Sequence, residues 1–166
     1  MFVNRITQRL SEEHRATVSV MERLEALITS QGREIPEAGA GSPASHLLRE
    51  IAGGVESEVM HHFDFEEQSL FALLEASGEA EIGAHLTEEH AAMRPLWARL
   101  AALARGAATA GFDEADWSEF RRVGLELCER MLAHIQKEDM ALLPLIEESM
   151  DAETEERLYD LYVTNA

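Results

Sequence analysis

Several kinds of residue are scarce in this 166-residue sequence, and each scarcity excludes a class of protein. A single cysteine, Cys128, excludes an internal disulfide and a cysteine-rich zinc site. Aromatic residues make up 6% of the chain, prolines number four and β-branched residues are sparse, so a strand-rich fold is disfavoured. No apolar run approaches the roughly 20 residues that a membrane span requires. The abundant residues are Leu, Ala and Glu, which favour helices.

Basic residues are also scarce, with 14 Lys and Arg against 32 Asp and Glu, giving a net charge of −18. A chain this acidic is not expected to bind nucleic acid or an anionic membrane surface, because both require a basic patch. Residues 1–14 lack the hydrophobic stretch and the small-residue cleavage site of a signal peptide, so we expect a cytoplasmic protein. The length suits one domain over residues 1–166 with a single core.

Apolar residues recur at every third or fourth position in four long segments, which predicts helices that each bury one face. The predicted helices span about 5–30, 43–77, 80–105 and 114–149, with a short fifth helix at about 152–163. We expect a bend at Gly53–Gly54, a kink at Pro95 and distorted last turns around Pro144. The two loops are of modest length, so the predicted fold is all-α, an antiparallel up-down-up-down four-helix bundle with a short C-terminal helix.

The second half of the chain repeats the first. LSEEH at 10–14 returns as LTEEH at 86–90, and nine of nineteen positions are identical between 10–28 and 86–104. A second pair of segments is also similar, namely HFDFEEQSLFALLEAS from His62 and HIQKEDMALLPLIEES from His134. This pattern predicts a duplicated helical hairpin with an approximate internal twofold axis, across which repeated residues face one another.

Four histidines and two glutamates fall on the helix faces that the core needs. These six residues, the central cluster, are His14, His62, Glu66, His90, His134 and Glu138. At a rise of 1.5 Å per residue, the four histidines lie roughly 22–30 Å from the loop ends of their helices, and therefore at similar depth. Each glutamate follows a histidine by four residues, so each pair projects from one helix face.

A buried carboxylate without a partner costs several kcal/mol, so the central cluster requires compensation. Four imidazoles and two carboxylates suit two first-row transition ions, each bound by two histidines and bridged by the carboxylates. This donor set favours iron or manganese over calcium, and the lack of thiolates argues against structural zinc. The alternative interpretation is a set of satisfied core histidines and ordinary ion pairs.

The order H, H-x3-E, H, H-x3-E of the central cluster resembles that of the haemerythrin-like (HHE cation-binding) family. The resemblance covers about residues 8–150 and includes HFxxEE at 62–67 and EEH at 88–90. It implies a non-haem centre of two iron ions with an oxo or hydroxo bridge inside the four-helix bundle. Glu66 and Glu138 are the bridging carboxylates by this resemblance, and iron is expected ahead of manganese or zinc.

Two positions depart from the oxygen-carrying haemerythrins. Leu86 stands where those proteins have a further histidine, one turn before the ligand of the third helix. Their fourth helix uses an aspartate at H-x4-D, whereas this chain offers Glu138 at x3 and Asp139 at x4, of which we favour Glu138. The missing histidine leaves one metal short of a protein ligand, to be replaced by water, an anion or a nearby side chain. An open position suits redox or ligand chemistry better than reversible oxygen carriage.

Other residues close to the central cluster in sequence are candidates to assist it. Glu58 lies one turn before a cluster histidine on the same face, while His61 and His85 point about 100° away from their cluster neighbours. For each, solvent exposure is the alternative. We interpret Glu13 and Glu89 as carboxylates of the surface or of the site's surroundings rather than as ligands. Core packing is expected, with walls of a dry pocket as the alternative, for Met21, Phe63, Met93, Trp97, Met131 and Ile135.

The sequence therefore predicts a non-haem di-iron protein that binds or reacts with O2, NO or a peroxide, as a sensor, scavenger or redox protein. The alternatives are an iron donor that repairs damaged iron–sulfur centres, and iron storage. The sequence leaves open whether the protein is an enzyme, which would then be an oxidoreductase that consumes peroxide or NO. The expected partner is a small diatomic ligand or peroxide, and no protein partner is indicated.

Overall fold

Residues 2–165 are described by a computed structural model, in which they form helices and connecting loops and no strand. The first bundle helix is α1 (Arg5–Gln31), and the third is α5 (Ala80–Ala110). The second and fourth are composite, because short π-helical turns interrupt them. The second comprises α2 (Ser45–Glu50), η1 (Ile51–Val55), α3 (Glu56–Phe65), η2 (Glu66–Leu70) and α4 (Phe71–Ala76). The fourth comprises α6 (Glu114–Lys137), η3 (Glu138–Leu142) and α7 (Leu143–Ser149), and α8 (Ala152–Thr164) follows.

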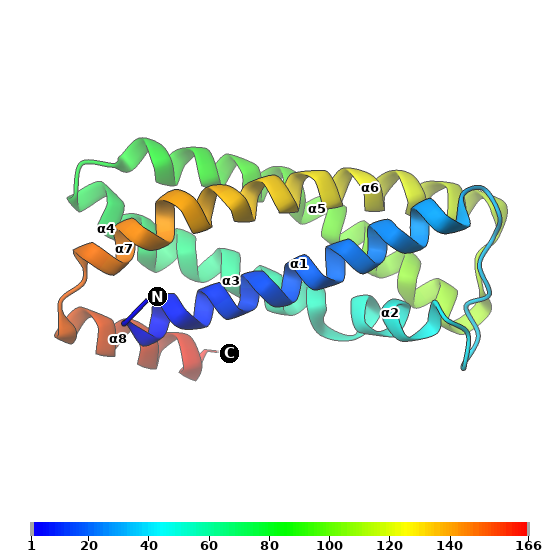
Figure 1. Ribbon diagram of the computed structural model, residues 1–166, viewed down its shortest axis with the longest axis horizontal. Helices are drawn as coiled ribbons and strands as arrows, with labels where there is room; N and C mark the ends of the chain where they lie inside the picture. The colour runs from blue at the N-terminus through cyan, green and yellow to red at the C-terminus, as the bar shows by residue number, and fades with distance from the viewer. Residues whose placement is uncertain (1, 166) are drawn as a thin grey trace.

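The four long helices lie side by side and alternate in direction (Figure 1). The α1–α2 loop and the α5–α6 turn lie at one end of the bundle, and the α4–α5 turn lies at the other. From that second end α8 folds back and runs alongside the first turns of α1. The chain is thus an antiparallel up-down-up-down four-helix bundle with a short C-terminal helix, as the sequence predicts.

Capping side chains and a glycine mark several of the helix ends. Asp113 caps α6 by accepting a hydrogen bond from the backbone N–H of Asp116 at 2.7 Å, and Asp151 caps α8 in the same way. Gly32 ends α1 with a φ of 60°, a left-handed conformation that favours glycine. The prediction that the third helix ends at 105 is wrong, because α5 continues through Gly106. An alanine-rich segment offsets the helix cost of one glycine, about 1 kcal/mol.

The sequence predicts distorted helices at three places, and the structure differs among them. Gly54 has non-helical dihedral angles (φ 179°, ψ −27°) inside η1, so the second helix bends at the glycine pair as predicted. Pro95 does not break α5, which is helical on both sides of it. Pro144 stands in the first turn of α7, directly after η3, where the absent N–H of a proline costs least.

Two apolar clusters fill the bundle on either side of its middle. The larger cluster lies towards the α1–α2 loop and includes Trp97 and Phe120. The smaller one lies towards α8 and includes Ile6 and Tyr162. Four leucines of the smaller cluster occupy equivalent positions of the duplicated hairpins, namely Leu10, Leu70, Leu86 and Leu142. The buried histidines and glutamates form a polar layer between these clusters.

No described helix is at once long enough and apolar enough to cross a membrane.

Candidate metal centre

All six residues of the central cluster meet in the polar layer of the bundle. One histidine comes from each of α1, α3, α5 and α6, and the two glutamates are the first residues of η2 and η3. None of the six is more than 6% exposed. The interior thus contains two carboxyl groups and four imidazoles that are almost completely removed from water.

The cluster divides into two groups of four residues. His14 and His62 form one group with Glu66 and Glu138, and His90 and His134 form the other with the same two glutamates. Within each group, one potential ligand atom per residue lies within 4.8 Å of all the others. Two neighbouring cation positions that share both carboxylates fit this geometry, with one histidine from each helix of a hairpin at each position.

The π-helical turns explain how residues spaced four apart all reach the interior. In an α-helix, a step of four residues rotates the side chain by about 40° beyond a full turn, so a run of such steps leaves one face. His62, Glu66, Leu70 and Leu74 are nevertheless all buried. η2 falls in the middle of this run, and a π turn holds more residues than an α turn, which reverses the drift. η3 occupies the equivalent place in the duplicate run.

Each cluster histidine donates its Nδ1 hydrogen to a carboxylate outside the cluster. These outer carboxylates are Asp139 for His14 (2.7 Å), Glu13 for His62 (2.9 Å), Glu67 for His90 (2.8 Å) and Glu89 for His134 (2.8 Å). Every outer carboxylate is the immediate sequence neighbour of a cluster residue, and the four contacts obey the internal twofold relation. Because Nδ1 of each imidazole donates its hydrogen to an outer carboxylate, the Nε2 lone pair points towards the middle of the central cluster.

The contacts at the centre require positive charge. The Nε2 atoms of His14 and His62 lie 3.1 Å apart, and those of His90 and His134 lie 3.0 Å apart. Two lone pairs at this distance repel unless a cation or a proton lies between them. Both oxygens of Glu66 are buried without a hydrogen-bond partner in the described residues, although imidazoles lie 3.1–3.4 Å away. The donor set therefore fits bound cations.

Without a metal, protons supply that charge. Burial alone would lower the pKa of His14, but contacts with Asp139 and Glu138 outweigh it and raise the pKa to about 9. Burial likewise opposes the contacts of His90 with Glu138 and Glu66, and its pKa is also raised to about 9. The pKa of Glu138 is held well below its usual range by the surrounding histidines, despite a desolvation cost that acts in the opposite direction.

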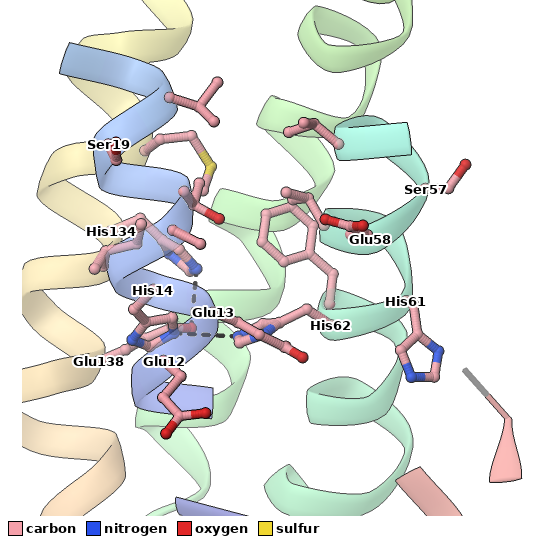
Figure 2. Close-up of a pocket in the computed structure, with 18 of the residues that line it drawn as sticks. Glu12, Glu13, His14, Ser19, Ser57, Glu58, His61, His62, His134 and Glu138 are labelled. Carbon is pink, nitrogen blue, oxygen red and sulfur yellow. Dashed lines mark hydrogen bonds and ion pairs between the residues drawn. The ribbon is translucent and has the colours of Figure 1, made fainter. Parts of the chain in front are cut away.

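The centre is closed on one side and accessible on the other. The four equivalent leucines seal the side towards α8, and Leu86 among them is 2% exposed. Between α1 and α3 a cleft of about 750 Å³ reaches His14, His62, His134 and Glu138. His62 and Glu58 project from α3 towards α1, whereas His61 projects to the other side of α3 (Figure 2). Phe63 lines the cleft and stacks on His90 with ring centroids 3.8 Å apart.

The residues predicted to assist the central cluster differ in their surroundings. Glu13 and Glu89 are half-buried and bonded to cluster histidines, so they are not free surface carboxylates. Glu58 is exposed at the cleft and outside both groups of four. The His61 ring packs at a tilt against the Tyr162 ring with centroids 4.6 Å apart, and the exposed His85 lies 3.2 Å from Glu89. Asp139, the alternative to Glu138 as a ligand, instead accepts the Nδ1 hydrogen of His14.

The six residues for which the sequence predicts core packing are all buried. Three of them also line the cleft, namely Phe63, Met131 and Ile135.

Two residues of the site, Glu67 and Tyr162, are not predicted by the sequence analysis. Glu67 is the twofold equivalent of Asp139, so comparison of the duplicated segments was a signal that could have found it. Its other partner, Arg94, reaches Glu67 at 3.1 Å and Asp64 at 2.8 Å. Tyr162 has no equivalent in the first hairpin, and no sequence pattern pointed to it.

A family model described as the Hemerythrin HHE cation binding domain matches residues 5–146. No curated protein and no solved structure matches the chain significantly.

Proposed function

The chain belongs to the haemerythrin HHE cation-binding family, and we propose that its buried centre binds two iron ions and a small ligand, either O2, NO or a peroxide. The observation that carries this proposal is the pair of four-residue groups that share Glu66 and Glu138. Sharing both carboxylates brings the two cation positions close together, so that one small ligand can reach both. The protein is a metal-binding, haemerythrin-like helical bundle; iron and the ligand are the proposed parts.

Donor chemistry supports iron. Imidazole nitrogen and carboxylate oxygen suit first-row ions that accept mixed ligands and tolerate octahedral geometry. The one thiol of the chain takes no part, because Cys128 is buried beside the carbonyl oxygen of Met21, 3.3 Å away. Two histidines and two shared carboxylates would give each ion four protein donors, fewer than the six that an octahedral ion accepts. Iron would supply redox chemistry at the remaining positions.

The protein's own residues control what reaches those positions. On the closed side, buried leucines exclude water, and a leucine at 86 provides no donor. On the open side, Val20, Val59 and Met131 give the cleft an apolar inner wall, and Glu12 and Glu58 lie exposed at its rim. Carboxylates at the rim and a net charge of −18 repel anions. These features favour neutral ligands such as O2, NO or hydrogen peroxide.

Blocking the cleft provides a test of this function. Thr17 lines the cleft one turn beyond His14, and Thr29 is an exposed threonine on the same helix. With iron-loaded protein, we expect spectral changes on mixing with NO or hydrogen peroxide. Thr17→Trp should slow them by about tenfold, which corresponds to about 1.4 kcal/mol of added barrier. Thr29→Trp should react like the unaltered protein, and all three proteins should contain equal iron.

Two outcomes of the stopped-flow experiment would contradict the proposal. Equal rates for the two tryptophan variants would mean that ligands do not enter through the cleft. The iron-donor function would be favoured if the iron-loaded protein reacts with none of O2, NO and hydrogen peroxide but transfers iron to a protein that lacks its iron–sulfur cluster.

A further inference from the structure

The C-terminal helix α8 reaches the metal centre although it lies outside the segment that matches the family. The match ends at residue 146, whereas α8 spans Ala152–Thr164. This helix packs along the first turns of α1 (Figure 1). Its residue Tyr162 is buried and also lines the cleft. A segment beyond the family pattern therefore contributes a polar side chain close to the cluster.

Tyr162 is joined to His62 through one shared carboxylate oxygen. The Tyr162 hydroxyl donates a hydrogen bond to Oε2 of Glu13, and the same oxygen accepts the Nδ1 hydrogen of His62 at 2.9 Å. The other oxygen of Glu13 accepts a hydrogen bond from Arg9 at 2.7 Å. With donors on both oxygens, the Glu13 carboxylate has little freedom to rotate. The orientation of the His62 imidazole is fixed accordingly.

The aromatic ring of Tyr162 is also held in place. It packs against the rings of His61 and Phe65, with centroids 4.6 and 4.5 Å away. Burial, followed by the contact with Glu13, raises the pKa of the Tyr162 phenol above its usual value, so the hydroxyl remains a neutral donor. Packing and hydrogen bonding thus place the hydroxyl at one defined point.

The internal twofold axis does not repeat this arrangement. Glu89, the equivalent of Glu13, is held by Lys137 and lies near His85. Both tyrosines of the chain, Tyr159 and Tyr162, lie in α8, so the second hairpin has no counterpart. Only the group that contains His14 and His62 receives a tyrosine. The two cation positions therefore differ in their surroundings even though their donor atoms are equivalent.

We propose that Tyr162 is a positioning residue of the metal centre, which holds Glu13 so that His62 presents Nε2 to the cation of the His14–His62 group. This inference rests on the proposed function, because it requires a metal at His62. It makes α8 a part of the centre, and it makes the two metal-binding steps unequal in their dependence on this helix. Because coupling between sites is reciprocal, metal binding must stabilise α8 in return.

The chain offers a matched pair of variants for the test. Tyr162→Phe keeps the ring and its packing and removes only the hydroxyl. Tyr159→Phe makes the same change one turn earlier on α8, where the ring lies 4.3 Å from the guanidinium of Arg5. The measurement is the stepwise binding of Fe(II) without oxygen, in competition with a chelator. Co(II) is a second probe, whose visible spectrum reports the ligand geometry.

We expect Tyr162→Phe to weaken one of the two binding steps by about tenfold, the lower end of the effect of removing a partner of a metal ligand. The other step should be unchanged, and Tyr159→Phe should match the unaltered protein in both. Glu13→Ala should weaken the same step, and combining it with Tyr162→Phe should add little, because both act through one path. Hydrogen exchange of residues 152–164 should slow on metal binding, and less so in Tyr162→Phe.

Three results would overturn the inference. They are unchanged affinity in Tyr162→Phe, equal weakening of both steps with a lower melting temperature of the metal-free protein, and fully additive effects of the Glu13 and Tyr162 changes. The second result would mean that Tyr162 only supports the fold. If the unaltered protein binds neither Fe(II) nor Co(II), the proposed function itself fails, which separates that failure from the failure of this inference.

Discussion

Replacing Glu138 by alanine should remove both metal ions from the protein, whereas replacing His14 by alanine should remove only one. Glu138 belongs to both groups of four, and its two oxygens face different halves of the centre. Oε2 lies 3.1 Å from Nε2 of His14, and Oε1 lies 2.9 Å from Nε2 of His134. A shared carboxylate is lost to both ions at once, but each histidine serves only one.

Metal content per chain, measured by elemental analysis after anaerobic loading, distinguishes these cases. We expect about two ions in the unaltered protein, about one in His14→Ala and almost none in Glu138→Ala, because loss of a direct ligand costs more than the 10–100-fold affinity loss seen for outer partners. Glu129→Ala, an exposed position of α6, is the control and should retain both ions. A Glu138→Ala protein with two ions would refute the sharing of this carboxylate.

Metal affinity should rise steeply with pH between about 6.5 and 9. His14 and His90 have a pKa of about 9 in the metal-free protein, so each is protonated at neutral pH and must lose a proton to bind a cation. His14 belongs to one position and His90 to the other, so each binding step releases at least one proton. The affinity of each step should therefore increase by at least about tenfold per pH unit, or at least about 100-fold from pH 6.5 to 8.5.

The metal-free protein should show the opposite trend. A histidine whose pKa is raised on folding stabilises the fold fully below its unfolded pKa, about 6.5, and the stabilisation is lost as pH rises through 9. Thermal unfolding should therefore show the metal-free protein weakening from pH 7 to 9 while the loaded protein gains stability. Chelator competition with Co(II) at several pH values measures the first effect. An affinity independent of pH would contradict the proton-for-metal exchange.

The central cluster could be predicted because its residues break a simple rule. Histidine and glutamate at positions where the helical repeat requires apolar side chains must be compensated, and the duplication showed that the exception occurs twice. Helix length and the loops then brought the four histidines to one depth. The same reasoning predicts two histidines for each cation position, and the structure groups His14 with His62 and His90 with His134.

The remaining details depend on tertiary contacts that no local pattern encodes. The outer carboxylate Glu67 lies on the α3–α4 helix, but its partner His90 belongs to α5. Tyr162 enters the site only because α8 folds back along α1. The π turns correspond to a sequence pattern in which four successive positions, each four residues apart, are all buried. An α-helix alone would not bury all four. The helix end predicted before Gly106 is wrong, because the alanine-rich segment around this glycine keeps α5 helical through it.

The central claim is tested most directly by metal analysis and an optical spectrum of the aerobically purified protein. We predict two iron ions per chain and the near-ultraviolet absorption bands of an oxo-bridged iron pair. One zinc ion per chain, or no metal at all, would contradict it.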